Sequence, residues 1–176
     1  MENLSSITLK ELTPDEANTY QAQAKTKLQS ILEGVAKDKR DMPDLSPNIK
    51  TPDTAPTFYD GKLTLAFAFG GVYAIVKTMP PAYMSVEGVE LSFEADGIAF
   101  GAGFGGAGLA GSSIYTAQEI AAFGQVHIHF DVATVAVKLN MWTTNMMPIG
   151  VWYGAQIGVP VAGGTFGANC GISLRS

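Results

Sequence analysis

Cysteine and charged residues are both scarce in this sequence. Cys170 is the only cysteine among 176 residues, so no disulfide can form within the chain, and neither redox compartment is excluded. Charged residues make up 15% of the chain and leave a net charge of −5. Binding to nucleic acid requires a basic surface that displaces counterions, so general nucleic-acid binding is excluded. Adhesion to anionic lipid by charge alone is disfavoured for the same reason.

Long apolar runs and export signals are also missing. A membrane-spanning helix needs about 18 or more consecutive apolar residues, and no stretch of this length is present, so no transmembrane segment is expected. The first residues, Met1 to Ser5, lack the basic flank and apolar core of a secretory signal. We therefore predict no signal peptide within this chain.

Motifs for catalysis and cofactor binding are equally few. The spacing Gly101-x-Gly103-x-x-Gly106 matches the dinucleotide-binding fingerprint, which requires a preceding parallel strand and a following helix. The neighbouring residues predict hairpins instead. Cys170 falls within an apolar alternation, where an inert buried thiol belongs. We expect no catalytic residues, no cofactor and no enzymatic activity.

The only cluster of metal-ligand type is His127-x-His129-x-Asp131. Strand alternation places all three on one face, with the two histidine Cα atoms about 7 Å apart, a workable spacing for a metal. The chain has no third histidine, and the predicted face is polar. We therefore expect a solvated strand face that gains charge at mildly acid pH, with a metal site as the minor alternative.

The first 56 residues predict an arm. Thr13, Pro14 and Glu16 form the start of a helix that extends over about residues 14–40. One helical face carries the apolar residues Ala17, Tyr20, Ala24, Leu28, Ile31 and Val35. Because this stripe is narrow, the helix either docks weakly or only on a partner, or packs on the domain. A proline-rich linker follows over residues 41–56, and the domain occupies residues 57–176.

The domain reads as a series of hairpins. Two-residue turns at Gly70-Gly71, Asp96-Gly97 and Gly163-Gly164 place apolar residues opposite one another on one face of each hairpin. A fourth change of alternation, at Ala133-Thr134, predicts a turn or a bulge that pairs Val132 with Val135. Between the two halves, Thr116 to Phe123 predicts a short helix that Thr116 caps and Gly124 ends.

A glycine-dense run from Asp96 to Gly111 is the most unusual stretch of the chain. The turn at Asp96-Gly97 predicts that Phe100 and Phe104 face inward and that glycines face outward, with a less regular turn at Gly105-Gly106. Glycine on the outer face would permit the curvature of a small barrel. The predicted fold is a small closed antiparallel Greek-key β-barrel of about eight strands with one short helix, behind a helical or flexible N-terminal arm.

The run Gly101-Ala-Gly103-Phe-Gly105-Gly106-Ala-Gly108-Leu-Ala-Gly111, continued by Ser-Ser-Ile114-Tyr115-Thr116, resembles the glycine-rich stretch ending in Tyr-Thr of the bacterial virulence-associated protein (Vap) family. The similarity covers about residues 57–176. It implies a compact eight-stranded Greek-key barrel and a secreted effector that acts on the host phagosome and lysosome, without known enzymatic activity. No catalytic residues are implied. Members of that family carry a secretion signal, which this chain does not show.

We therefore expect a non-enzymatic, virulence-associated barrel that interacts through its surface with an unknown protein or a membrane or lipid target. Trp142 and Trp152 both fall on outward-facing strand positions and are candidate contact residues. One alternative is a calyx that binds a small hydrophobic ligand or lipid in the barrel. Another is a membrane-active protein that reorganises its glycine-rich strands into lipid.

Overall fold

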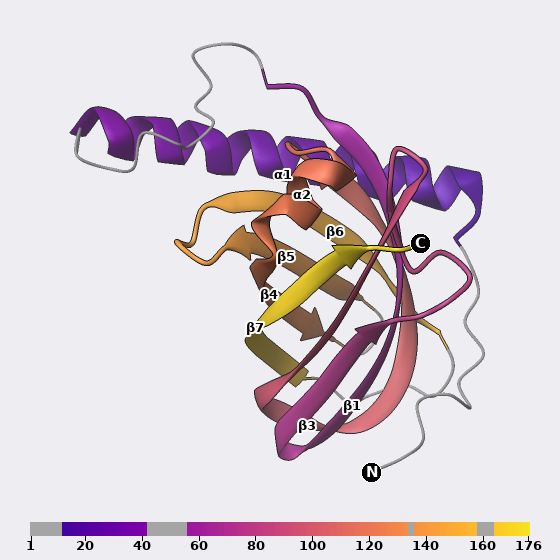
Figure 1. The fold of residues 1–176 in the computed structure, drawn as a ribbon. Coiled ribbons are helices and arrows are strands. Elements are labelled where there is room, and N and C mark those ends of the chain that lie inside the picture. Colours follow the sequence, from indigo (N-terminus) through magenta and orange to yellow (C-terminus); the bar gives the residue numbers. More distant parts are fainter. Residues whose placement is uncertain (1–11, 42–55, 134–135, 158–163) are drawn as a thin grey trace.

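A computed structural model of the protein describes residues 12–41, 56–133, 136–157 and 164–176 (Figure 1). Within these ranges the chain forms two helices and seven strands. In chain order they are α1 (Pro14–Asp41), β1 (Tyr59–Thr78), β2 (Met84–Val86), β3 (Val89–Ser113), α2 (Ala117–Phe123), β4 (Gln125–Val132), β5 (Val137–Thr143), β6 (Pro148–Ile157) and β7 (Gly164–Leu174).

The strands form a closed antiparallel barrel, which confirms the predicted fold class. The sheet order is β1-β2-β3-β6-β5-β4-β7, and β7 returns to pair with β3, so that β3, β6, β5, β4 and β7 form a ring. β1 and β2 extend this ring along β3. The chain passes from β3 through α2 to β4, yet β3 lies beside β6, which is a Greek-key arrangement. Closure leaves few unpaired strand edges.

β1 and β3 are two long strands that each account for two of the predicted shorter ones. They pair from Tyr59 opposite Ser113 to Lys77 opposite Glu94. The predicted turns at Gly70-Gly71, Asp96-Gly97 and Gly105-Gly106 are therefore wrong. The change of alternation near Gly71 comes from a register shift between Gly71 and Tyr73. A bulge changes the side-chain alternation in the same way as a turn does, so the pattern alone does not distinguish them.

Over residues 97–104 the glycine-dense run faces the opposite way from the prediction. Odd-numbered residues from Leu91 to Ala99 face inward, so Ala95 and Ala99 are buried in the core while Phe100 is exposed. Phe104 packs on the outer face against Ala66 and Ala68.

Gly101 and Gly103 lie where β3 bends, with φ angles of 145° and 120°. Residues with a side chain rarely adopt such angles, so glycine is required at this bend. The strand turns there from pairing with β7 to pairing with β6. The glycine run thus allows one continuous strand to contribute to two sides of the barrel.

The β4–β5 hairpin has the predicted faces but a register that differs by two residues. Val132 pairs with Val137, and Phe130 with Leu139. At the end of the hairpin the Ala133 N–H donates to the Ala136 carbonyl at 2.8 Å. Thr134 and Val135, part of the expected tight turn, lie outside the described residues.

Of the predicted hairpin about Gly163-Gly164, the strands that the structure describes, β6 and β7, do not pair with each other. β6 pairs with β3 and β5, while β7 pairs with β4 and β3. A strand with alternating apolar residues can pair with any other such strand. The alternation therefore predicts which residues of β7 face inward, but not which strands lie beside β7. Gly163 itself lies outside the described residues.

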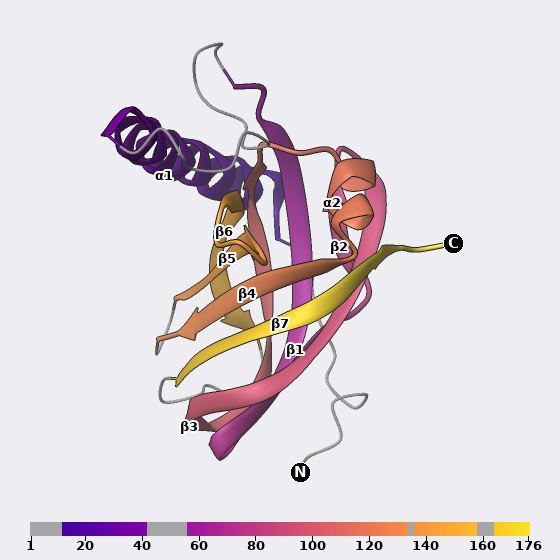
Figure 2. The ribbon, with the colours of Figure 1, turned by 60° about the vertical axis from the view of Figure 1, so that its left-hand side comes forward.

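Helix α1 packs against the barrel, the second of the two arrangements left open. Among the side chains that the structure describes on α1, the buried ones are Ala17, Gln21, Ala24, Leu28 and Leu32. The helix crosses the outer side of β6 and the second half of β3 (Figure 2). The Gln21 side-chain amide donates to the Gly61 carbonyl at 3.3 Å, and Lys25 Nζ lies 2.8 Å from Asp60 Oδ1. The proline-rich segment after the helix lies largely outside the described residues, so the boundary at residue 56 stays a prediction.

Both predicted helix starts are confirmed by their capping contacts. At α1 the Glu16 N–H donates to Thr13 Oγ1 at 3.3 Å, and the Thr13 N–H donates to the Glu16 carboxylate at 2.9 Å. At α2 the same reciprocal pair joins Thr116 and Glu119, and Gly124 ends the helix. In the part of the chain described here, no helix is long and apolar enough to span a membrane.

Large side chains occupy the barrel interior. Trp152, Phe67, Phe130 and Phe166 are fully buried. The Phe67 ring lies 5.3 Å from that of Phe130 and 5.8 Å from that of Phe69, measured between centroids. Ring pairs at these separations add to the stabilisation that burial of apolar area provides.

Candidate functional site

The predicted polar face on β4 exists. His127 and His129 alternate along the strand with Asp131, as predicted, and their neighbours on β5 are Trp142, Asn140 and Lys138. His127 Nδ1 lies 2.8 Å from Asn169 Oδ1, and His129 Nδ1 lies 3.3 Å from Asp131 Oδ2. Asp131 also accepts a hydrogen bond from the Thr165 hydroxyl.

These contacts occupy the three candidate metal ligands with different partners. His127 contacts an asparagine of β7, whereas His129 contacts Asp131. Among residues 12–41, 56–133, 136–157 and 164–176, no three His, Cys, Asp or Glu side chains are grouped so that they could hold a metal ion. The face is a partly exposed, hydrogen-bonded network on the outside of the barrel.

The two candidate tryptophans differ in position. Trp142 is half-buried on the outer face, beside His127. Trp152 is fully buried, so its prediction as a surface contact residue is wrong. It pairs with Leu139, an inward residue, which places both side chains inside the barrel. The predicted orientation relied on a pairing of β6 with β7 that the fold does not contain.

Cys170 is buried, as predicted, but its neighbour is Val126 of β4 rather than Ile157. Burial raises the pKa of its thiol from 9.0 to about 12. The thiolate is the reactive form, so this thiol is unreactive at neutral pH.

The raised pKa of Cys170 predicts a loss of stability in alkali. The folded chain keeps the thiol protonated, whereas the unfolded chain releases this proton above its ordinary pKa of 9.0. The stabilising contribution is therefore complete below about pH 9 and is lost as pH rises towards about 12. Denaturant unfolding at pH 8 and 10.5 should show a smaller decrease in Cys170→Ala than in the wild type. An equal decrease in both proteins would contradict the assignment.

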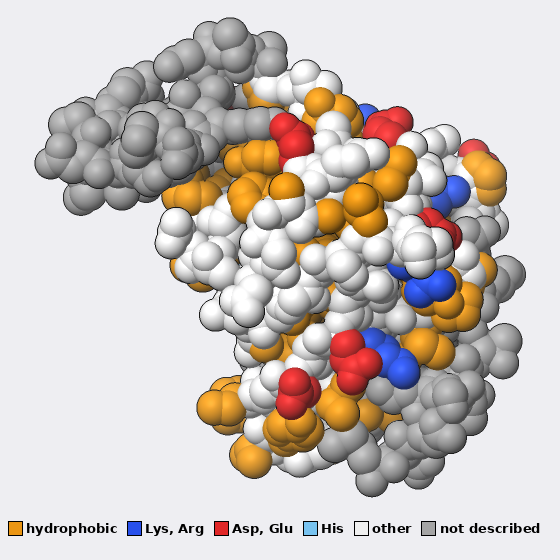
Figure 3. All heavy atoms as spheres, viewed as in Figure 1, with side chains coloured by type: hydrophobic (Ala, Val, Ile, Leu, Met, Phe, Trp, Pro, Cys, Tyr) orange, Lys and Arg blue, Asp and Glu red, His pale blue; other side chains and the backbone are white. Residues whose placement is uncertain are grey.

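Among the residues that the structure describes, the largest group of exposed apolar side chains lies at the bend of β1 and β3, and we call it the apolar tip: Val72, Tyr73, Ile98 and Phe100. Their exposed fractions are 70%, 38%, 74% and 67%. Tyr73 and Ile98 are cross-strand neighbours. Hydrophobic side chains gather at this lower end of the molecule (Figure 3).

The apolar side chains of the tip adjoin acidic residues of β3. The Tyr73 hydroxyl donates to Asp96 Oδ2 at 2.5 Å, and this hydrogen bond, with smaller contributions from desolvation and the carboxylate charge, raises the pKa of Tyr73. Asp96 and Glu94 precede Ile98 on the same outer face of β3. The tip therefore combines exposed apolar side chains with a tyrosine whose hydroxyl is hydrogen-bonded to an acidic residue.

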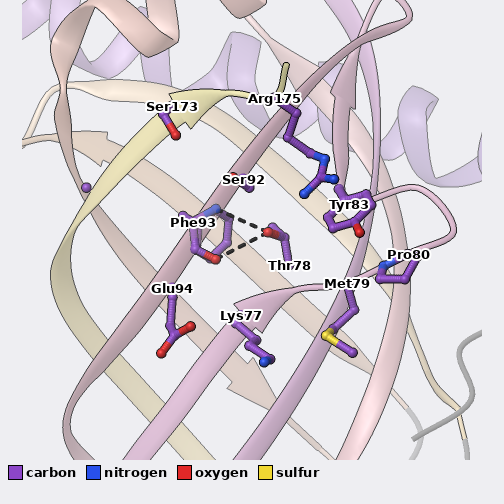
Figure 4. Close-up of a pocket in the computed structure, with 11 residues that line it drawn as sticks. Lys77, Thr78, Met79, Pro80, Tyr83, Ser92, Phe93, Glu94, Ser173 and Arg175 are labelled. Atoms are coloured by element: carbon purple, nitrogen blue, oxygen red, sulfur yellow. Dashed lines mark hydrogen bonds between the residues drawn. The ribbon is translucent and has the colours of Figure 1, made fainter. Parts of the chain in front are cut away.

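A second feature is an open groove of about 660 Å³ on the outer surface between β1, β3 and β7 (Figure 4). Lys77 and Glu94 lie at one end, with Tyr83 and Arg175 at the other. The Thr78 hydroxyl is already hydrogen-bonded within the sheet, because it donates to the Phe93 carbonyl and accepts from the Phe93 N–H. Ser92 and Ser173 face each other across β3 and β7.

Sequence reasoning missed both surfaces. It placed Phe100 and Ile98 inside because they are large and apolar, although the inward alternation of Leu91, Phe93 and Ala95 continues through Gly97 and Ala99. If the same alternation is continued through Gly97 and Ala99, it predicts that Ile98 and Phe100 face outward, as they do in the structure. No local pattern indicates the groove, because it depends on the pairing of β3 with β7.

The fold defines a small antiparallel β-barrel with two helices. No family model matches the sequence, and no curated protein is similar to it in sequence. Among solved structures, the chain is similar to the virulence-associated protein VapB from Rhodococcus equi, with 15% identity and a TM-score of 0.44. The similarity covers 68% of this chain and 96% of that one.

Proposed function

We propose that this protein is a non-enzymatic, virulence-associated barrel of the effector type, and that it acts by docking its apolar tip on a membrane surface. The observation that carries the proposal is the exposure of three aliphatic or aromatic side chains, Val72, Ile98 and Phe100, on one bend. The resemblance of the glycine-rich run to Vap sequences supports the effector role.

The shape and chemistry of the tip favour lipid as the target. The bend projects from the end of the barrel in both ribbon views (Figures 1 and 2), so its side chains can enter a flat bilayer together. Tyr73 suits the interface, where aromatic rings with a polar end are enriched. Asp96 and Glu94 lie behind the tip, so attraction to anionic lipid contributes little.

Two further observations favour surface binding over catalysis or an internal ligand. Cys170 is buried with a raised pKa, and the His129–Asp131 pair lies on an open strand face. The large side chains of Trp152 and Phe67 fill space inside the barrel that would hold the ligand in a calyx.

The test is partition onto phosphatidylcholine vesicles, measured by flotation. The double variant Ile98→Ser and Phe100→Ser should bind at least about tenfold more weakly, since burial of each large apolar side chain contributes about 1.5–3 kcal/mol. Both residues are exposed, so the free energy of unfolding should change little. Added phosphatidylserine should not increase binding.

A matched control changes two exposed apolar residues away from the tip, Met146→Ser and Leu174→Ser. It should bind as the wild type does. Equal binding by the wild type and the tip variant would contradict the proposal, and so would an equal loss in the control. Release of an encapsulated dye at neutral or acid pH would indicate insertion of the strands into lipid, the alternative mode of action.

A further inference from the structure

Arg175 is held in one orientation at the end of the groove. Its guanidinium carbon lies 3.4 Å from the centroid of the Tyr83 ring, and its Nε lies 3.5 Å from Glu90 Oε2. Its backbone N–H donates to the Glu90 carbonyl at 3.0 Å. Stacking fixes the plane of the guanidinium and the Glu90 contact occupies one edge. Among the described residues, its two terminal nitrogens have no hydrogen-bond partner.

The backbone that carries the Tyr83 ring is held by two hydrogen bonds. The Tyr83 N–H donates to the Met79 carbonyl at 2.9 Å, and the Tyr83 carbonyl accepts from the Thr64 N–H at 2.7 Å. Tyr83 has a φ angle of 39°, which a bulky residue rarely adopts. Such a conformation persists only where the surroundings enforce it, so the platform for Arg175 is preformed.

Hydroxyl groups lie in the same groove. Ser92 and Ser173 are cross-strand neighbours on its floor, and in the described part of the chain neither hydroxyl makes a hydrogen bond. Figure 4 shows Ser173 and Arg175 extending from the same strand end into the groove. Glu94 lies at the opposite end, beside its cross-strand neighbour Lys77, so its carboxylate is away from Arg175.

We propose that this groove binds an oxyanion, either a carboxylate or a phosphate group, on the free edge of the Arg175 guanidinium. A planar guanidinium donates two parallel hydrogen bonds to such a group, and the serine hydroxyls add further donors. Because Tyr83 and Glu90 already fix the arginine, little side-chain entropy is lost on binding. This site is separate from the apolar tip and does not depend on the proposed membrane docking.

The experiment is an NMR titration of the full chain with sodium phosphate or sodium acetate at constant ionic strength, with sodium chloride as the reference. Dissociation constants on the order of 1 mM or below are expected for one of the two anions. The largest shifts should occur at the amides of Ser92, Ser173 and Arg175. Tighter binding of phosphate would indicate a phosphate ester as the natural ligand, and tighter binding of acetate a carboxylate.

The decisive variant is Arg175→Lys, which keeps the charge but removes the planar fork. It should weaken binding by about tenfold, and Ser173→Ala by a smaller factor. The control Lys138→Gln removes a cation near the Tyr153 ring on another face and should leave binding unchanged. Shifts equal to those with chloride, or unaltered by Arg175→Lys, would overturn the proposal, as would equal weakening by the control.

Discussion

Gly111→Ala should destabilise the protein by about 3 kcal/mol or more, because an added methyl group has no space and no flexible neighbour that could move. A Cβ atom there would overlap the Val151 carbonyl and lie 2.7 Å from the Trp152 Cα atom. Both are backbone atoms of the adjacent strand β6, so relief requires β3 and β6 to separate. Chemical denaturation monitored by circular dichroism measures the loss.

The control for this substitution is Gly34→Ala on α1. A Cβ atom at Gly34 meets nothing within 4 Å, and alanine favours a helix interior over glycine by about 1 kcal/mol. The same chemical change should therefore stabilise the protein at residue 34 and destabilise it strongly at residue 111. A loss at Gly111 below about 1 kcal/mol would mean that the strands do not approach each other as closely as described.

Leu28→Ala should cost about 2–5 kcal/mol, the range for truncation of a buried leucine. Leu28 is fully buried and belongs to the same core cluster as Val151 and Leu109 of the barrel. The measurement is the free energy of unfolding in denaturant, together with the number of transitions. One transition, shifted as a whole, is expected because α1 and the barrel share one core.

The control for Leu28→Ala is Gln23→Ala on the exposed face of the same helix, which should change stability by no more than about 0.5 kcal/mol. A helix that docks weakly would give a different result. Leu28→Ala would then leave the main transition in place, and only helix content would fall. That outcome would mean that α1 is an arm that folds separately from the barrel.

Local chemistry made part of this fold predictable. Capping residues located both helix starts, since Thr13 with Glu16 and Thr116 with Glu119 each satisfy two free backbone N–H groups within a few residues. The strict alternation on β4 and β5 placed the right side chains inward. The class of fold followed from many such segments, each with one apolar face.

The pairing of strands could not be obtained from the sequence in the same way. Glycine and alanine at inner positions carry no hydrophobic signal, so the run around Gly97 and Ala99 was read in the opposite orientation. Which strands become neighbours depends on contacts distant in sequence, such as β3 with β6 and β7. The apolar tip and the groove both arise from these long-range pairings.

The most direct measurement of the proposed function places a fluorescent probe on the apolar tip. Ile98→Cys can be labelled with an environment-sensitive dye because Cys170 is buried, and Leu174→Cys carries the same dye on β7, beside Leu91 near the start of β3. With phosphatidylcholine vesicles, the emission of the probe at residue 98 should shift to shorter wavelength and strengthen, while that at residue 174 stays as in buffer. An unchanged probe at residue 98, or equal responses at both positions, would contradict membrane docking through the tip.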